Sequence, residues 1–188
     1  MDYTKGLKAY LDKEIEVIQS LDLDSINLVM NVLEEAKRNR KTTYICGNGG
    51  SAATASHFVC DFNKGLNDEA SQFKFQCLSD NTPIMMAISN DIGYDEVFRY
   101  QIKGRIVEGD ILFGISGSGN SMNVINAMEH AKSVGARTIA LVGYDGGKMK
   151  QIADYCIHVN INDMQISEDI HMIMDHLMMS VLSYGYKC

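Results

Sequence analysis

The sequence predicts an α/β fold in which a doubly wound, five-stranded parallel sheet is covered by helices on both faces. Five short apolar or β-branched runs alternate with segments whose apolar residues recur at helical spacing. Two of these runs end in turns rich in glycine and serine that lead directly into a helical segment. Parallel strands joined in this way need right-handed crossovers, so a three-layer α/β/α arrangement follows.

The elements are expected in a regular order. Two N-terminal helices come first, one over residues 3–21 and one from residue 25. Strands are expected at residues 42–46, 75–78, 111–115, 137–142 and 155–159. Helices between the strands are expected at residues 52–62, 84–90, 96–102, 122–134 and 148–153, and a long C-terminal helix at residues 166–184.

Length and composition limit the function classes. A chain of 188 residues is the size of one α/β domain, so we expect a single domain with residues 1–41 as a helical extension. The net charge of −7 excludes nucleic acid as a default partner. No segment is apolar enough to span a membrane or to act as a secretion signal, so we expect a cytoplasmic protein without a membrane partner. The five cysteines lack C-x-x-C spacing, which indicates reduced core thiols.

The first glycine-rich turn is Gly47-Asn48-Gly49-Gly50-Ser51, between a buried strand and a helix. Backbone N–H groups at a helix start lack intrahelical partners and carry the positive end of the dipole, so they favour phosphate or sugar oxygens. An ordinary turn that needs glycine is an equal alternative. His57 and Asp61, four residues apart, share one face of the following helix and are expected to face the same volume as the turn.

A second turn, Ser116-Gly117-Ser118-Gly119-Asn120-Ser121, follows the third strand and adds three hydroxyls. In a sheet of order 2-1-3-4-5 the first and third strands flank the point where chain progression reverses, and ligands bind there. The two turns are therefore expected to be neighbours and to bind a phosphorylated small molecule. Two unrelated turns are the alternative.

The last helix carries a polar cluster within a very apolar segment. The cluster consists of Glu168, Asp169, His171, Asp175 and His176. Buried ionisable groups require partners or a metal. With His57 and Asp61, these side chains supply ligands that suit a divalent metal such as zinc, and a metal-free hydrogen-bonded network is the alternative.

Together these motifs resemble the sugar isomerase (SIS) domain, and more closely the bacterial phosphoheptose isomerases. The resemblance spans about residues 42–182 and includes the segment Asn90-Asp91-Ile92-Gly93-Tyr94 and the loop Gly143-Tyr144-Asp145-Gly146-Gly147-Lys148. It implies a flavodoxin-like SIS fold, a homotetramer, and zinc or another divalent metal. It also implies conversion of sedoheptulose 7-phosphate, or a closely related heptose phosphate, to D-glycero-D-manno-heptose 7-phosphate.

The resemblance also implies roles for individual residues. Sugar contacts are expected from the first turn and one later pair: Asn48, Gly49, Gly50, Ser51, Asn90 and Asp91. Phosphate contacts are expected from Ser116, Ser118 and Ser121, and metal ligands at His57, Asp61, Glu168 and His176. Asp61 is expected to act as the base and His176 as the general acid, with Glu168 as an alternative base.

The chain departs from the family pattern at several of these positions. Asp61 replaces a glutamate, Glu168 replaces a glutamine, and Gly117 replaces the middle residue of a Ser-Thr-Ser run. Gln165 and Ile166 stand where the family has an Asp-Arg pair. The changes add negative charge, which favours a bound dication. The alternative to an isomerase is a non-catalytic protein that binds a phosphosugar or a protein partner.

Overall fold

The computed structural model describes residues 1–66 and 72–184. Its five parallel strands form one sheet in the order β2-β1-β3-β4-β5, which confirms the predicted doubly wound topology. The strands are β1 (Thr43–Cys46), β2 (Phe75–Cys77), β3 (Ile111–Ser116), β4 (Arg137–Val142) and β5 (Tyr155–His158). Strand β3 is central, where Phe113 pairs with Ile45 of β1 and Ile139 of β4.

The helices follow the predicted order with shifted ends. They are α1 (Thr4–Gln19), α2 (Leu23–Arg38), α3 (Gly50–Cys60), α4 (Thr82–Asp91), α5 (Arg99–Ile102), α6 (Met122–Ser133), α7 (Gly147–Ile152) and α8 (Met164–Tyr184). A π-helical turn, Asp61–Gly65, extends α3, and a 3₁₀ turn, Tyr94–Glu96, precedes α5. Helix α2 starts two residues before its predicted start because the side chain of Asp22 accepts hydrogen bonds from the Asp24 and Ser25 amides.

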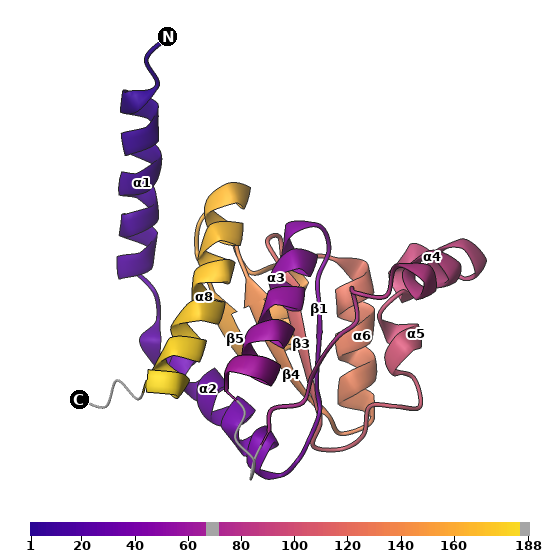
Figure 1. Cartoon of the computed structure of the whole chain (residues 1–188). Coiled ribbons are helices and arrows are strands. Elements are labelled where there is room, and N and C mark those ends of the chain that lie inside the picture. Colours follow the sequence, from indigo (N-terminus) through magenta and orange to yellow (C-terminus); the bar gives the residue numbers. More distant parts are fainter. Residues whose placement is uncertain (67–71, 185–188) are drawn as a thin grey trace.

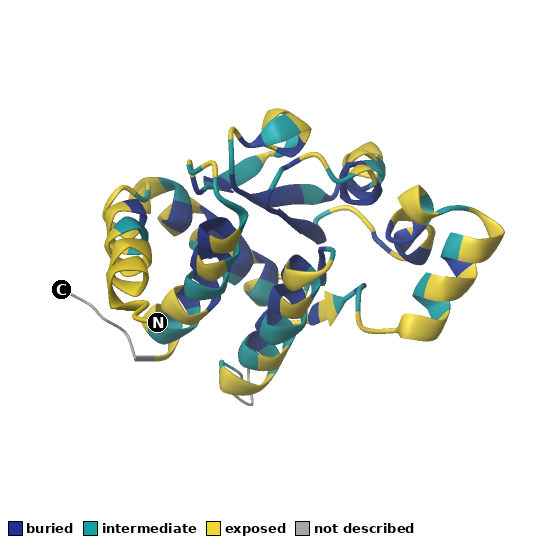
Figure 2. Ribbon diagram, turned by 90° about the horizontal axis from the view of Figure 1, so that it is seen from above, coloured by how far each residue is buried: buried dark blue, intermediate teal, exposed yellow. Residues whose placement is uncertain are grey.

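The sheet is buried on both faces, because successive strand residues point to opposite sides. On one face, Ile45 and Phe113 belong to a core with α2, α3 and α8. On the other face, Tyr44 and Leu112 belong to a core with α5, α6 and α7. Helices α3 and α8 lie side by side over the first face (Figure 1). Seen from above, the strands are mostly dark blue, and yellow lies mainly on the surrounding helices and loops (Figure 2).

Helix α1 projects away from this body (Figure 1). Val17 is its one buried residue. Side-chain contacts connect it to the rest: the Tyr10 hydroxyl donates to the Asp169 carboxylate at the start of α8, and Lys13 Nζ lies 2.7 Å from Asp163 Oδ2.

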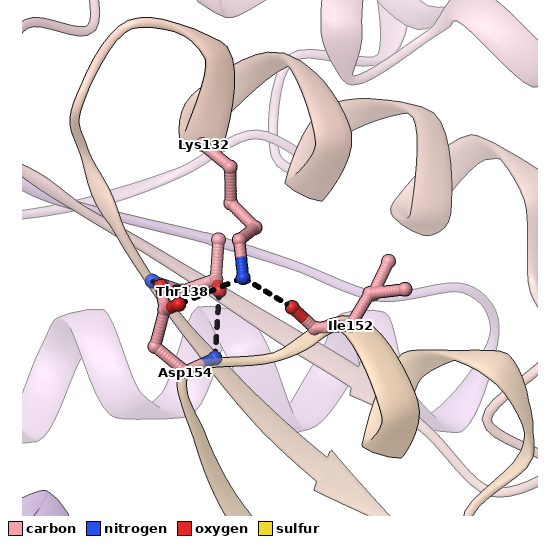
Figure 3. A network of polar contacts seen from close by, with 4 residues as sticks. All are labelled: Lys132, Thr138, Ile152 and Asp154. Carbon is pink, nitrogen blue, oxygen red and sulfur yellow. Dashed lines mark hydrogen bonds and ion pairs between the residues drawn. The ribbon is translucent and has the colours of Figure 1, made fainter.

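A polar network closes the amino-terminal edge of β4 and β5 (Figure 3). Asp154 Oδ2 accepts hydrogen bonds from the amide and the hydroxyl of Thr138 at 2.9 and 2.8 Å. Lys132 Nζ donates to Asp154 Oδ1 and to the Ile152 carbonyl, both at 2.7 Å. Burial opposes ionisation of Asp154, but these hydrogen bonds lower its pKa. The network lies at the edge opposite to the two glycine-rich turns.

The described cysteines are free, and three of them agree with the predicted core thiols. Cys46 is buried, and burial raises the pKa of Cys77 to about 12 and of Cys156 to about 11. Cys60 is exposed, so the prediction is wrong there: the last turn of α3 directs it away from the core. Cys188 lies outside the described residues. Among the described helices, none has the length and apolarity needed to cross a membrane.

Candidate functional site

The two glycine-rich turns lie next to each other at the carboxyl ends of β1 and β3, as the predicted topology requires. Their side chains are joined by a pair of amide hydrogen bonds. Asn48 Nδ2 donates to Asn123 Oδ1 at 3.0 Å, and Asn123 Nδ2 donates to Asn48 Oδ1 at 2.9 Å. Asn123 belongs to the first turn of α6, so this pair connects the start of α6 to the first turn. The starts of α3 and α6 therefore border one region of the sheet edge.

The backbone of the first turn lies close to the carboxylate of Glu168. Gly49 has a φ of 55° and precedes α3. A Cβ atom placed on Gly50 would lie 2.4 Å from Glu168 Oε2, so a side chain at this position would displace the Glu168 carboxylate. The Glu168 carboxylate thus lies against the positive end of the α3 dipole. The Tyr94 hydroxyl also donates to Asn48 Oδ1 at 2.7 Å.

In the second turn, some of the serine hydroxyls form hydrogen bonds within the turn itself. Ser116 is buried, and its Oγ accepts the Gly119 amide at 3.1 Å and lies 2.9 Å from Ser121 Oγ. Gly119 has a φ of +66°, and a Cβ there would lie 2.0 Å from the Gly146 carbonyl oxygen. Ser118 and Ser121 are half-buried.

A pocket of about 450 Å³ opens beside this second turn. Its lining residues are Ser118, Asn120, Tyr144, Asp145, Asn160 and Asn162. The Tyr144 carbonyl lies 2.9 Å from His158 Nε2, and Tyr144 itself has a positive φ of 46°. The pocket provides polar side chains from the loops after β3, β4 and β5.

Four potential metal ligands gather where α3 meets α8. His57, Asp61, Asp175 and His176 each offer one ligand atom, and these atoms all lie within 4.8 Å of one another. His57 Nε2 lies 3.1 Å from His176 Nε2, 3.7 Å from Asp61 Oδ2 and 3.9 Å from Asp175 Oδ2. Tetrahedral zinc with bonds of about 2.0–2.2 Å separates its ligand atoms by about 3.3–3.6 Å. The donor types and spacings therefore fit a divalent metal.

Local backbone geometry helps to bring Asp61 into this group. Helix α3 ends at Cys60, and Asp61 opens the π-helical turn. Asp61 itself keeps α-helical backbone angles and its amide donates to the His57 carbonyl, so the two side chains lie four residues apart on one face.

Asp175 is the most deeply placed member of the group. Its side chain is 0% exposed, and neither carboxylate oxygen has a hydrogen-bond partner among the described residues. Burial raises the pKa of Asp175 to about 7, and the charge of Asp61 adds to this effect. One turn earlier on α8, burial lowers the pKa of His171 to about 4, so this imidazole is neutral at pH 7.

Comparison with known proteins assigns the chain to a family. A family model described as the SIS domain matches residues 3–143. The phosphoheptose isomerase of Helicobacter pylori (strain Shi470) is 39% identical over 171 residues, which covers 91% of this chain and 87% of the relative. The chain belongs to the SIS domain family, among the phosphoheptose isomerases. The Aliarcobacter butzleri (strain RM4018) phosphoheptose isomerase agrees, at 35% identity over 95% of this chain and 94% of the relative.

Solved phosphoheptose isomerases share the architecture. The structure from Neisseria gonorrhoeae has a TM-score of 0.89 and 28% sequence identity, and the match covers 97% of this chain and 100% of that one. The structure from Francisella tularensis has a TM-score of 0.86 at 24% identity, covering 98% and 100% of the two chains. The predicted SIS fold and family are confirmed.

The site residues expected of a phosphoheptose isomerase lie at two different heights along the packed helices α3 and α8. His57, Asp61 and His176 come together, whereas Glu168 lies at the level of Gly50. His57 follows Gly50 by seven residues, which is about 10 Å along the helix. The expected common volume is therefore an elongated region, with the first turn at one end and the His/Asp group at the other.

The remaining expected sugar contacts lie at the end of α4. Asn90 and Asp91 are exposed, and Asn90 Nδ2 donates to Asp91 Oδ1 at 2.8 Å. Asn90 and Tyr94 line a shallow pocket of about 360 Å³. Because Tyr94 also contacts Asn48, this pocket adjoins the first turn.

Sequence reasoning missed three parts of this SIS site. Asn160 and Asn162 line the larger pocket, and their position directly after the last strand is the signal that would have indicated them. Asn123, in the first turn of α6, is not part of any motif in the sequence analysis. Asp175 belongs to the polar cluster that the sequence offers to a divalent metal, but the family resemblance does not include it among the four expected ligands.

Proposed function

We propose that this protein is a phosphosugar aldose–ketose isomerase that acts on sedoheptulose 7-phosphate or a closely related heptose phosphate. One observation carries the proposal: a chain similar to phosphoheptose isomerases over most of its length also has a His/Asp group where α8 meets the helix that begins at its first glycine-rich turn. Isomerisation of a phosphosugar needs a general acid, a general base and a phosphate-binding site, and the described residues include candidates for each.

The proton transfers are assigned to residues of the His/Asp group. In the ketose-to-aldose direction, a carboxylate removes a proton from C1 and returns one to C2, while an acid protonates the C2 oxygen and the C1 hydroxyl loses its proton. We assign the carbon-bound proton to Asp61 and the oxygen-bound proton to His176. His176 Nε2 lies 3.1 Å from His57 Nε2, so we assign the proton transfer to Nδ1 of His176. Glu168 is the alternative base, at the level of the first turn.

The two turns are proposed to bind the rest of the substrate. Ser116, Ser118 and Ser121 would hold the phosphate together with the free amides at the start of α6. Asn48, Gly49, Gly50 and Ser51 would hold sugar oxygens, aided by Asn90 and Asp91. Such contacts to non-reacting parts of the substrate position C1 and C2 for proton transfer.

We propose that the site uses a divalent metal and that zinc is the ion. His57, Asp61 and His176 are the expected ligands that the described structure groups together, and imidazole with carboxylate suits zinc. When bound, such an ion polarises the substrate carbonyl.

We also propose a cytoplasmic homotetramer with no nucleic-acid or membrane partner. The exposed apolar residues of α1, which include Leu7, Leu11 and Ile15, support burial of this helix against other copies of the chain. The net charge of −7 supports the absence of a nucleic-acid partner.

Deuterium exchange tests the isomerase directly. Zinc-loaded protein is incubated with sedoheptulose 7-phosphate in deuterated water, and NMR follows deuterium at C1 and the formation of aldoheptose phosphate. We expect both, and we expect Asp61→Asn to lower the exchange rate by at least about 100-fold, as for loss of a general base. Asp24→Asn removes an equal charge from an exposed position of α2 and serves as the control.

Two other outcomes have clear meanings. If Glu168→Gln rather than Asp61→Asn abolishes exchange while phosphosugar binding persists, Glu168 is the base. If the metal-loaded protein binds phosphosugars but catalyses no exchange with any of a panel of them, the isomerase proposal is wrong and the binding-protein alternative stands.

A further inference from the structure

We infer that Asp175 is the fourth metal ligand of this chain, at the position in the ligand set that the family resemblance gives to Glu168. The site would then be formed by two imidazoles and two carboxylates, from His57, Asp61, Asp175 and His176. This inference rests on the metal of the proposed function, but it concerns only which side chains hold that metal.

The first support is the isolation of the Asp175 carboxylate. The side chain is fully buried, and neither oxygen accepts a hydrogen bond from any described residue. A buried carboxylate without partners is strongly destabilising unless it is protonated or paired with a cation. A metal at this position would provide the missing partner.

The second support is the direction of the carboxylate. Asp175 Oδ2 lies 3.9 Å from His57 Nε2, and its ligand atom is within 4.8 Å of those of the other three residues. His176 follows Asp175 directly, so the two side chains leave α8 about 100° apart. Asp175 is buried and His176 is exposed. The two side chains could therefore bind one ion from its buried side and from its solvent side.

The third support is the location of Glu168. Its carboxylate lies beside the backbone of Gly50, at the start of α3. On α8 it precedes Asp175 by seven residues, which is about 10 Å along the helix axis. Glu168 is therefore placed to face a ligand at the first turn, whereas Asp175 is placed to face the metal.

The charges of this ligand set are balanced. Two carboxylates and two neutral imidazoles neutralise one divalent cation.

Cobalt titration of the metal-stripped full-length protein tests the inference. Cobalt(II) substitutes for zinc in tetrahedral sites, and its visible absorption is intense in four-coordinate sites and weak in six-coordinate ones. We expect wild type to bind one equivalent with intense absorption. Asp175→Asn should lower the affinity at least about tenfold and weaken the absorption, because even outer-shell changes cost 10- to 100-fold.

Glu168→Gln is the matched comparison, because it removes the same charge from the same helix and restores the family residue. We expect its cobalt affinity to stay within about threefold of wild type, because the Glu168 carboxylate lies at Gly50, about 10 Å along α8 from Asp175. Asp175→Glu keeps a carboxylate and should recover part of the lost affinity. Circular dichroism of each stripped variant checks folding.

The inference is overturned if Asp175→Asn binds cobalt as wild type does, or if Glu168→Gln loses the affinity instead. It is also overturned if wild type binds no metal. Its failure is distinguishable from that of the isomerase: a wild-type protein that exchanges deuterium while Asp175→Asn binds metal normally refutes only the ligand assignment. Asp175-dependent metal binding without exchange refutes only the reaction.

Discussion

Ser116 and Ser118 are two residues apart in the same turn, and their hydroxyls have different surroundings. Ser116 is buried and accepts the Gly119 amide, so its hydroxyl contributes to the shape of the turn. Ser118 is half-buried and lines the 450 Å³ pocket, and its Oγ accepts only the Asn120 amide among the described residues. The Ser118 hydroxyl proton is thus available to a phosphate oxygen.

This difference predicts different consequences of two alanine substitutions. Ser118→Ala should raise the KM for the phosphosugar about tenfold, because one hydrogen bond to a charged group contributes roughly 1.5 kcal/mol. Ser116→Ala should lower the free energy of unfolding by about 1 kcal/mol. Steady-state kinetics and thermal unfolding measure the two effects, with Ser133→Ala at the end of α6 as the control. Equal effects of both substitutions on KM and stability would contradict the distinction.

At the scale of elements, α1 is the helix with least attachment to the core. Two side-chain contacts supplement Val17, one from Tyr10 to Asp169 and one from Lys13 to Asp163. The hydrogen bond to Asp169 raises the pKa of Tyr10 from 10.0 to about 12. The hydrogen bond from Lys13 lowers the pKa of Asp163. Both contacts therefore depend on pH, at opposite ends of the range.

The signs follow from linkage. Tyr10 has a raised pKa, so its contribution to docking is complete below pH 10 and is lost as the pH rises towards 12. Asp163 has a lowered pKa, so its contribution is present above the usual value of 3.8 and is lost as the pH falls below it. Docking of α1 should be most stable between these limits.

Limited proteolysis with subtilisin can test the alkaline limit. Cleavage within α1 should be faster at pH 11 than at pH 9, after normalisation to an unstructured peptide. Tyr10→Phe lacks the hydrogen bond and should be cleaved rapidly at both values. If wild type and Tyr10→Phe are cleaved at equal rates at pH 9, the contact does not restrain α1.

At the scale of the whole molecule, the His/Asp group joins two segments distant in sequence. His57 and Asp61 come from α3 and the turn after it, whereas Asp175 and His176 come from α8. An unfolded chain does not hold these four side chains together, so a metal that binds them stabilises the folded state.

Metal removal should therefore lower the Tm. At a free zinc concentration 100 times Kd the stabilisation is about 2.7 kcal/mol. For a chain of this size that corresponds to roughly 5–10 °C. Differential scanning calorimetry with zinc and with EDTA measures the difference, and magnesium, which prefers oxygen ligands, should produce a smaller shift. An identical Tm in zinc and EDTA would show that the folded protein binds no zinc.

Much of this molecule was predictable from local patterns. The strand order, the two turns at the reversal point and the parallel α/β layers follow from the alternation of apolar runs with helical segments. The spacing of apolar residues in each segment indicates whether it is a strand or a helix and which residues it buries. Ends of elements were less predictable: the Asp22 cap moved the start of α2, and the π-helical turn at Asp61 has no clear sequence signature.

By itself, the sequence determined the fold class and the family, because residue types and their periodicity along the chain carry both, and the family resemblance predicted His57, Asp61 and His176 as metal ligands. Only the tertiary structure decided that Asp175 joins this group and that Glu168 lies at Gly50 instead. The physical reason is that the packing of α8 against α3 sets which side chains meet, and the sequence of either helix alone does not specify this alignment.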